Sequence, residues 1–222
     1  MAKKVGVILA GCGVYDGSEI YETVITLLAL DRAGAEAVCM APDIDQMHVV
    51  NHLSGDVAEG ETRNVLVESA RIARGNIGNL AEAKATDLDA LIIPGGFGAA
   101  KNLCDFAVKG PDCDVNPEVA RLIREMFAAK KPVAAVCIAP AILSKVLGED
   151  NVPHKLTIGT DEGTAAALDK MGSSHVQCPA RDFVIDPSIK LVSTPAYMLA
   201  GSISEAAEGI EKAVNALLDL ID

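Results

Sequence analysis

The distribution of apolar residues along the chain predicts alternating strands and helices. Apolar runs, typical of strands buried on both faces, occupy 5–10, 37–41 and 133–136; a further strand is predicted at 88–93, where only Asp89 interrupts the run, and a short one at 156–158. Apolar positions at helical spacing predict helices over about 18–33, 117–129, 164–171 and 204–221. Two runs at 182–186 and 190–193 flank a Pro-containing turn and predict an antiparallel pair near a sheet edge.

This alternation predicts an α/β fold: a doubly wound, mostly parallel sheet between two layers of helices. The segment 45–79 fits the alternation less well, because it combines a polar stretch at 51–56 with a helix-like stretch at 62–73. We interpret it as an insertion, with room for strand pairing around 46–52, within a single domain that spans 1–222. In such sheets the ligand site lies beyond the carboxyl ends of the strands.

Composition narrows the class of protein. Half of the 222 residues are hydrophobic but only 3% are aromatic, so the core must consist of Ala, Val, Ile and Leu. The net charge of −12 argues against binding to nucleic acid or to anionic lipid. No apolar stretch reaches the length of a membrane span, and the first apolar run is too short for a signal peptide. The six cysteines include no Cys-x-x-Cys pair, which favours a reducing, cytoplasmic location.

Cys137 is the strongest candidate for chemistry. It ends the apolar run 133–136, and an Ala-rich helical segment follows at once, as at a nucleophile elbow. Such a turn crowds the residues two before and two after the nucleophile, and Ala135 and Ala139 are both small. The nearby helix N-terminus would favour a thiolate. The alternative is a structural cysteine buried in a parallel strand.

Two further groups are candidates for the same site. Gly95 and Gly96 follow the strand at 88–93, and their amides, with that of Ile138, could hold an oxyanion; the alternative is a simple glycine turn. Glu22 lies one turn into the first helix, on the less apolar side, because Ile20, Val24, Leu27 and Leu28 share the other face. A glutamate there is normally solvated. If the helix start faces the site, Glu22 would be buried beside the thiol with a raised pKa.

The histidines and the first glycine-rich loop give weaker signals. No two of the four histidines, and no His with Cys, have the spacing of a metal site, so we expect no metal. His154 and His175 follow Cys137 and are candidates for a third member of the site, although a lone histidine is more often structural. Gly11-x-Gly13 lacks the third glycine of a dinucleotide fingerprint, since Asp16 occupies that position.

Several segments together resemble the PfpI-type branch of the class I glutamine amidotransferase-like superfamily. They are 5–10, 22–25, 32–34, 93–96 and 135–140. The segments 9–20, 61–65, 95–102 and 194–199 extend the similarity to bacterial glyoxalases of this branch, which are also described as isoprenoid-biosynthesis proteins. The resemblance implies a flavodoxin-like sandwich, usually a homodimer, with Cys137 as nucleophile and Glu22 as its acid/base partner.

The resemblance also implies an activity: conversion of glyoxal to glycolate, and of methylglyoxal to lactate, through a hemithioacetal on Cys137 and without a cofactor. The expected partner is therefore a small 2-oxoaldehyde. Many relatives carry a histidine in the segment after the elbow strand, where this chain reads Leu156-Thr157-Ile158. Glutaminases carry a His-Pro-Glu-like motif where this chain has Thr194-Pro195-Ala196, which argues against glutamine hydrolysis. A redox-sensing or chaperone-like protein that uses a reactive Cys137, and an ancillary factor in isoprenoid biosynthesis, are the alternatives.

Overall fold

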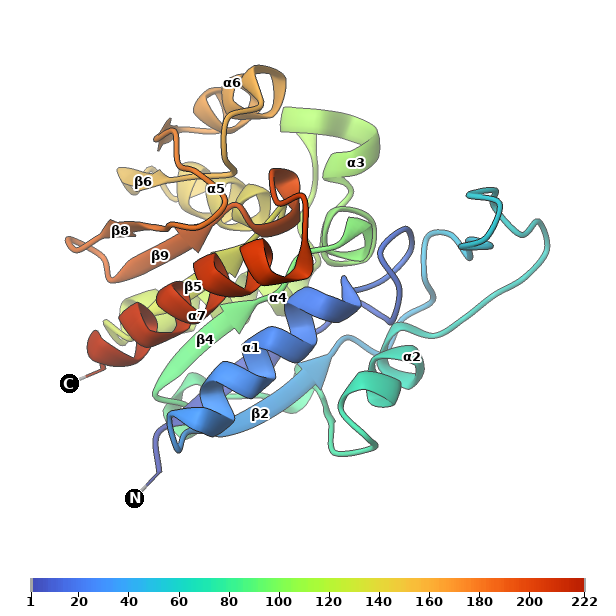
Figure 1. Cartoon of the computed structure of the whole chain (residues 1–222), viewed down its shortest axis with the longest axis horizontal. Helices are drawn as coiled ribbons and strands as arrows, with labels where there is room; N and C mark the ends of the chain where they lie inside the picture. The colour runs from blue at the N-terminus through green and yellow to red at the C-terminus, as the bar shows by residue number, and fades with distance from the viewer. Residues whose placement is uncertain (1, 222) are drawn as a thin grey trace.

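The computed structural model, which describes residues 2–221, is a three-layer α/β sandwich (Figure 1). Its sheet has seven strands in the order β3-β2-β1-β4-β5-β9-β8. All neighbours are parallel except β8 and β9, which form the predicted antiparallel pair at the edge. The strands are β1 (Lys4–Ile8), β2 (Glu36–Ala41), β3 (Gly78–Asn79), β4 (Ala90–Ile93), β5 (Val133–Val136), β8 (Val184–Asp186) and β9 (Leu191–Thr194).

Helices cover both faces of this sheet. They are α1 (Ile20–Arg32), α2 (Val65–Ile72), α3 (Phe106–Lys109), α4 (Pro117–Ala128), α5 (Pro140–Glu149), α6 (Glu162–Lys170) and α7 (Ile203–Asp219). Short 3-10 or π turns are η1 (Leu80–Glu82), η2 (Ala85–Asp87), η3 (Ala99–Leu103), η4 (Gly110–Asp112) and η5 (Ala196–Met198). A separate two-stranded parallel sheet pairs β6 (His154–Leu156) with β7 (Ser173–His175), a strand that the apolar pattern did not predict. Among residues 2–221, no helix combines the length and apolarity needed to cross a membrane.

The two halves of the core follow from the pleat of the strands. In β4, Leu91 and Ile93 point into the cluster beneath α4 and α5, whereas Ala90 and Ile92 point into the cluster beneath α1 and α7. All four are fully buried. Figure 1 shows α1 and α7 side by side on one face of the sheet. The continuous apolar runs predicted strands buried on both faces, and the mostly parallel, doubly wound sheet is confirmed.

The buried face of α1 is not the one that its apolar residues indicated. Ile20, Val24 and Leu28 are 40–48% exposed, whereas Glu22 and Thr26 are fully buried. The helix starts at the carboxyl end of the sheet and packs against α7, so the side that carries Glu22 must face inward. Of the two possibilities left open for Glu22, the structure shows burial, because packing against the sheet and α7 overrode the pattern of the helix by itself.

The segment 45–79 leaves the body of the protein as a projecting arm before it returns through α2 (Figure 1). The arm is closed by an antiparallel bridge between Val50 and Val57. Its base is attached to the loop after β1, where the carboxylate of Asp16 accepts a hydrogen bond of 2.7 Å from the Val50 amide. The bridge at Val50 lies within 46–52, where the sequence left strand pairing possible. The description of 45–79 as an insertion stays an interpretation.

Candidate active site

Three loops meet at the carboxyl ends of β1, β4 and β5, at the point where the strand order reverses and where sheets of this kind bind ligands. The loop after β4 packs against the loop after β1, and the Gly98 amide donates to the Gly17 carbonyl at 2.9 Å. Glycine is required for this close approach, because a Cβ on Gly98 would lie 2.4 Å from the Gly17 Cα.

Cys137 lies on a tight turn between β5 and α5. Its φ is +62°, a left-handed conformation that non-glycine residues rarely adopt. The turn is held in place because the Cys137 amide donates to the Thr194 carbonyl at 2.9 Å and the Ala139 amide donates to the Val136 carbonyl at 3.0 Å. Ala135 and Ala139 are fully buried against the turn, as expected from their small size. Strand, strained cysteine and helix follow one another as in a nucleophile elbow.

Glu22 is the immediate partner of this thiol. It is the third residue of α1 and is fully buried. Its two carboxylate oxygens accept hydrogen bonds from the Gly95 amide at 3.0 Å and from the Tyr197 amide at 3.1 Å. The Cys137 thiol donates a third hydrogen bond to the same carboxylate. Residues that follow three different strands, β4, β5 and β9, therefore converge on a single carboxyl group.

Burial changes the acid–base properties of both groups. Desolvation, reinforced by the nearby charge of Glu19, raises the pKa of Glu22 to about 8, despite its three hydrogen bonds. Desolvation and the carboxylate of Glu22 raise the pKa of the Cys137 thiol above its usual value. The resting sulfur is therefore a thiol rather than the thiolate that the helix N-terminus favours. The Cys137 thiol can still become a thiolate by passing its proton to the Glu22 carboxylate, since the summed charge of the two groups then stays the same.

The amides of the predicted oxyanion site divide into two roles. Those of Gly96 and Ile138 hydrogen-bond to the Cys137 sulfur and oppose the rise in its pKa. The Gly95 amide is engaged by Glu22 instead, so it holds the carboxylate and does not face the sulfur. Two donors are left at the sulfur, which is the number that an oxyanion hole commonly uses.

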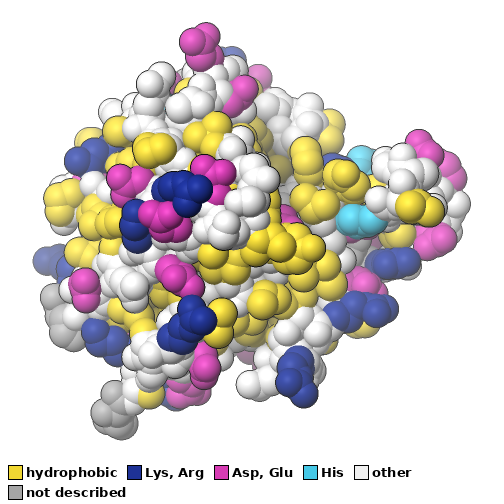
Figure 2. Space-filling model, in the orientation of Figure 1, with side chains coloured by type: hydrophobic (Ala, Val, Ile, Leu, Met, Phe, Trp, Pro, Cys, Tyr) yellow, Lys and Arg dark blue, Asp and Glu magenta, His cyan; other side chains and the backbone are white. Residues whose placement is uncertain are grey.

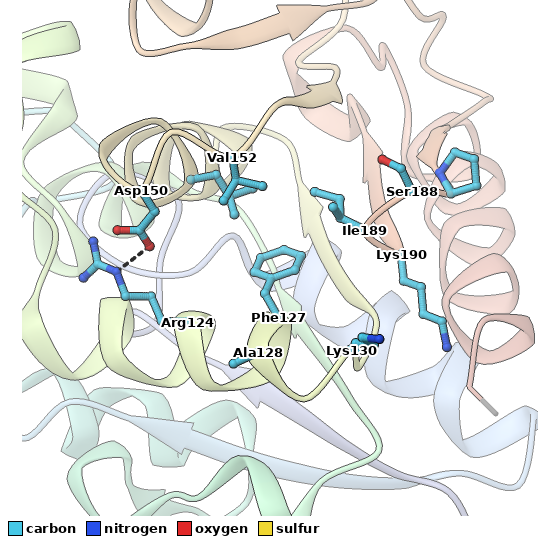
Figure 3. A pocket seen from close by; sticks show the side chains of 11 residues that line it. Arg124, Phe127, Ala128, Lys130, Asp150, Val152, Ser188, Ile189 and Lys190 are labelled. Carbon is cyan, nitrogen blue, oxygen red and sulfur yellow. Dashed lines mark hydrogen bonds and ion pairs between the residues drawn. The ribbon is translucent and has the colours of Figure 1, made fainter.

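A cavity of about 470 Å³ opens over Cys137. Glu19, Phe97, Phe106 and Tyr197 line it, together with Thr164 and several apolar residues. A larger cavity, of about 610 Å³, lies elsewhere, around Phe127 between the ends of α4 and α5 and the turn before β9 (Figure 3). None of the residues that line this larger cavity lines the one over Cys137, so we assign the site by chemistry and not by size.

Neither histidine candidate joins the pair. His154 is buried in β6, where its Nδ1 contacts the Val152 carbonyl at 2.8 Å and its Nε2 contacts the Ser173 hydroxyl at 2.7 Å. His175 ends β7, and its Nε2 accepts a hydrogen bond of 3.3 Å from the Ile158 amide. Both rings therefore serve the small β6–β7 sheet. Among residues 2–221, no group of three His, Cys, Asp or Glu side chains is placed to hold a metal.

Two residues at the site were not identified from the sequence. Glu19 caps α1, because its carboxylate accepts a hydrogen bond of 2.6 Å from the Glu22 amide, and it also lines the cavity. Tyr197 follows β9 in η5 and contributes both its amide and its ring. The rule that ligands bind beyond the carboxyl ends of parallel strands points to Tyr197 once β9 is recognised as a parallel neighbour of β5.

The fit of Gly95 gives a direct test of this geometry. A Cβ there would lie 2.4 Å from the Cys137 Cβ and 2.6 Å from a Glu22 oxygen. We expect Gly95→Ala to lower the free energy of unfolding by about 1–3 kcal/mol, because the crowded groups must move apart. Gly78→Ala is the matched control, since a Cβ there meets nothing within 4 Å. Urea denaturation of both variants measures the difference, and equal stabilities would contradict the described packing.

Comparison with known proteins identifies the fold and the relatives of this chain. Residues 4–154 match the model of the DJ-1/PfpI family. The chain is 39% identical to an isoprenoid biosynthesis protein with an amidotransferase-like domain from Ehrlichia chaffeensis; its crystal structure superposes with a TM-score of 0.92 over 100% of both chains. This similarity confirms the flavodoxin-like fold.

Two curated relatives cover nearly the whole chain. A rat protein named ES1 protein homolog, mitochondrial, is 46% identical over 98% of this chain and 84% of its own length. A human protein named glutamine amidotransferase-like class 1 domain-containing protein 3, mitochondrial, is 46% identical over 99% of this chain and 84% of its own length. These names contradict the cytoplasmic location that we expected from the cysteines. The expectation failed because reduced cysteines do not distinguish the cytosol from other reducing compartments.

Proposed function

This chain belongs to the DJ-1/PfpI family, and we propose that it is a cofactor-independent glyoxalase that converts glyoxal, and methylglyoxal, into the corresponding 2-hydroxy acid. The observation that carries the proposal is the hydrogen bond between the Cys137 thiol and a buried Glu22 carboxylate whose pKa is about 8. A soft nucleophile beside a base that titrates near neutral pH is what this reaction needs.

The first step is addition of sulfur to the aldehyde carbon. Glu22 accepts the thiol proton as the S–C bond forms and then donates this proton to the aldehyde oxygen, which gives a hemithioacetal and restores the Glu22 carboxylate. The amides of Gly96 and Ile138 lie at the sulfur, where they can donate to the negative oxygen while it develops. The pair and the substrate together keep the same total charge throughout, because the negative charge moves from Glu22 to the substrate oxygen and back.

The second step is an internal oxidation and reduction. Glu22 removes the hydrogen from the carbon attached to sulfur, which gives an enediol, and returns a proton to the neighbouring carbon. The former aldehyde carbon becomes a thioester and the neighbouring carbonyl becomes an alcohol, so no external oxidant is required. Water then cleaves the thioester and releases the 2-hydroxy acid and the free thiol.

Product analysis in D₂O tests both the activity and this route. We expect the freshly reduced protein to form glycolate from glyoxal, with deuterium on the carbon that carries the hydroxyl, because a proton held by Glu22 can exchange with solvent. Nuclear magnetic resonance of the product measures both the amount of glycolate and its deuterium content, with a protein-free reaction as the control. Absence of glycolate would overturn the activity, and glycolate without deuterium would replace the enediol by a direct hydride shift.

The redox-sensing alternative receives less support from the site. A sensor cysteine is typically exposed and has a lowered pKa. Cys137 is only 7% exposed, and desolvation together with Glu22 raises the pKa of its thiol. Both properties slow direct oxidation by peroxide, whereas neither hinders a reaction in which the substrate enters the cavity and Glu22 accepts the proton.

We also propose that the protein is a homodimer built on α1. Ile20, Tyr21, Val24 and Leu28 of this helix are 40–50% exposed, and the Tyr21 ring pairs with that of Tyr197 at 6.2 Å. Figure 2 shows hydrophobic side chains gathered over the first half of α1. A contiguous apolar surface of this kind is typical of an interface.

Sedimentation velocity tests the dimer. We expect the wild-type protein to sediment as a dimer and Val24→Asp as a monomer, because the substitution places a charge in the apolar face of α1. Val67→Asp is the control: Val67 is 62% exposed on α2, outside this face. A monomeric wild type, or a Val24→Asp variant that stays dimeric, would contradict the assignment.

A further inference from the structure

We propose that the cavity over Cys137 is built for a neutral 2-oxoaldehyde with an apolar, preferably aromatic, substituent, and that it disfavours anionic ligands. This inference rests on the glyoxalase activity proposed above and names the substrate class of the same site. Three observations carry it: the size of the cavity, the side chains that line it and the charges that it contains.

The cavity is much larger than glyoxal requires. Glyoxal consists of two carbons and two oxygens, and the reacting end of any 2-oxoaldehyde occupies only the space next to Cys137. The volume of about 470 Å³ lies within the range of roughly 300–1,000 Å³ that is typical of pockets for complete small-molecule ligands. Most of the space is therefore available to a substituent on the ketone carbon.

The lining of this space is unusually aromatic for this chain. The protein has no Trp, four Phe and three Tyr, yet Phe97, Phe106 and Tyr197 all border the cavity. They come from three separate places: the loop after β4, the start of α3, and η5. The remaining apolar groups are Val14, Ala100, Ala107, Ile138 and Met198. Rings that face a common space from several elements provide the stacking and edge contacts that an aromatic substituent would use.

The charges in the cavity disfavour an anion. Among the described residues that line the cavity, Glu19 alone has a charged side chain, and Glu22 lies beside it, next to the thiol. No Lys, Arg or His is among the described residues that line the cavity. The nearby Lys101 donates to the Tyr15 carbonyl at 2.9 Å and places its ammonium 5.4 Å from the centre of the Phe97 ring, where it is already engaged. An anionic substrate would therefore meet the Glu19 carboxylate in a partly desolvated space, where repulsion is strong.

Steady-state kinetics tests the preference for an apolar substituent. We expect kcat/KM for phenylglyoxal to exceed that for glyoxal at least about tenfold, a factor within the range that apolar pocket contacts supply. Phe106→Ala should reduce this difference, because it lowers kcat/KM for phenylglyoxal by a larger factor than kcat/KM for glyoxal. Phe127→Ala is the matched control, because Phe127 lines the other cavity (Figure 3) and should leave the preference unchanged.

The half-exposed Phe97 supplies a second variant should Phe106→Ala fail to fold, since its loss disturbs the core little. Phe97→Ala is expected to lower the same ratio of phenylglyoxal to glyoxal turnover. Equal kcat/KM for the two aldehydes in the wild-type protein would overturn the inference while leaving the glyoxalase activity intact. A preference that survives both substitutions would show that these rings do not recognise the substituent, and would also overturn it.

A second measurement does not depend on turnover. We would follow alkylation of Cys137 by mass spectrometry with three reagents of one chemical type: N-benzyl iodoacetamide, iodoacetamide and iodoacetate. Each alkylation rate of Cys137 is divided by the rate of the same reagent with free cysteine. On this scale the benzyl reagent should react at least about fivefold faster than iodoacetamide, and iodoacetate should react at least about fivefold slower than iodoacetamide. Glu19→Gln should raise the iodoacetate rate selectively, because it removes a charge but keeps an oxygen that can cap α1.

The two measurements separate the two proposals. If no 2-oxoaldehyde is converted but the alkylation rates follow the expected order, the glyoxalase proposal fails and the assignment of the cavity to neutral, apolar ligands stands. If glyoxal is converted but the three reagents alkylate Cys137 at equal relative rates, the activity stands and the substrate class is wrong.

Discussion

Cys137→Ala is expected to lower the turnover of glyoxal by a factor on the order of 10⁴ or more, which is the usual cost of removing a covalent nucleophile. The substitution removes the sulfur and its hydrogen bonds with Glu22, Gly96 and Ile138, but the turn keeps the backbone hydrogen bonds from Cys137 to Thr194 and from Ala139 to Val136. We therefore expect the variant to remain folded. Formation of glycolate, measured with freshly reduced protein, gives the rate.

Cys39→Ala is the matched control for this experiment. Cys39 is also a buried thiol, and burial raises its pKa to about 11, but it lies in β2 and does not line the cavity over Cys137. Its loss should leave turnover within a factor of about two, since it removes only a small buried group remote from the chemistry. Comparable losses in both variants, or near-normal turnover by Cys137→Ala, would contradict the assigned nucleophile.

Glu22→Gln is expected to lower kcat by about 10²–10⁴, the usual contribution of a general acid/base. For the wild-type protein, kcat/KM should rise with pH through about 8, because Glu22 must lose its proton to act as a base. The amide cannot accept a proton, so the residual rate of the variant should lack this rise. A wild-type rate that is constant from pH 6 to 9 would contradict the role of Glu22.

The same substitution should change how stability depends on pH. The ordinary pKa of a glutamate is 4.5, whereas that of buried Glu22 is about 8, so between these values the folded state binds more protons than the unfolded state. The free energy of unfolding therefore falls as the pH rises through this window, by several kcal/mol in total. Glu22→Gln removes this contribution.

The test therefore compares the free energy of unfolding of the wild-type protein with that of Glu22→Gln. Urea denaturation at pH 5, 6, 7 and 8 gives the difference between the two as a function of pH. A constant offset is expected in addition, because glutamine has one acceptor oxygen for the two amides of Gly95 and Tyr197. The offset does not depend on pH, so parallel curves for the two proteins would contradict the raised pKa. A relative gain in stability of the variant toward pH 8 is the expected result.

Features that are local in the chain could be predicted from the sequence. The four parallel apolar runs predicted β1, β2, β4 and β5 to within a few residues, because a strand buried on both faces must be apolar throughout. The elbow was visible for a similar reason: the end of a strand, the small Ala135 and Ala139, and the start of a helix are consecutive in sequence. The glycines at 95 and 96 were recognised because close backbone approach excludes side chains.

The burial of Glu22 and the identity of its hydrogen-bond partners depended on which residues the fold brings together. The sequence placed Glu22 on the more polar side of a helix, and only the packing of α1 against the sheet and α7 turned that side inward, buried the carboxylate and raised its pKa. The partners of Glu22 come from loops as distant as Gly95 and Tyr197, whose backbone amides carry no signal in their residue type. The sequence by itself thus determined the strands, the turn and the thiol, because these follow from local sterics and apolar patterning. Apart from the family resemblance, which already paired Glu22 with Cys137, only tertiary structure decided how the carboxylate is buried and held against the thiol and which rings border the cavity, because desolvation and hydrogen bonding depend on neighbours distant in the chain.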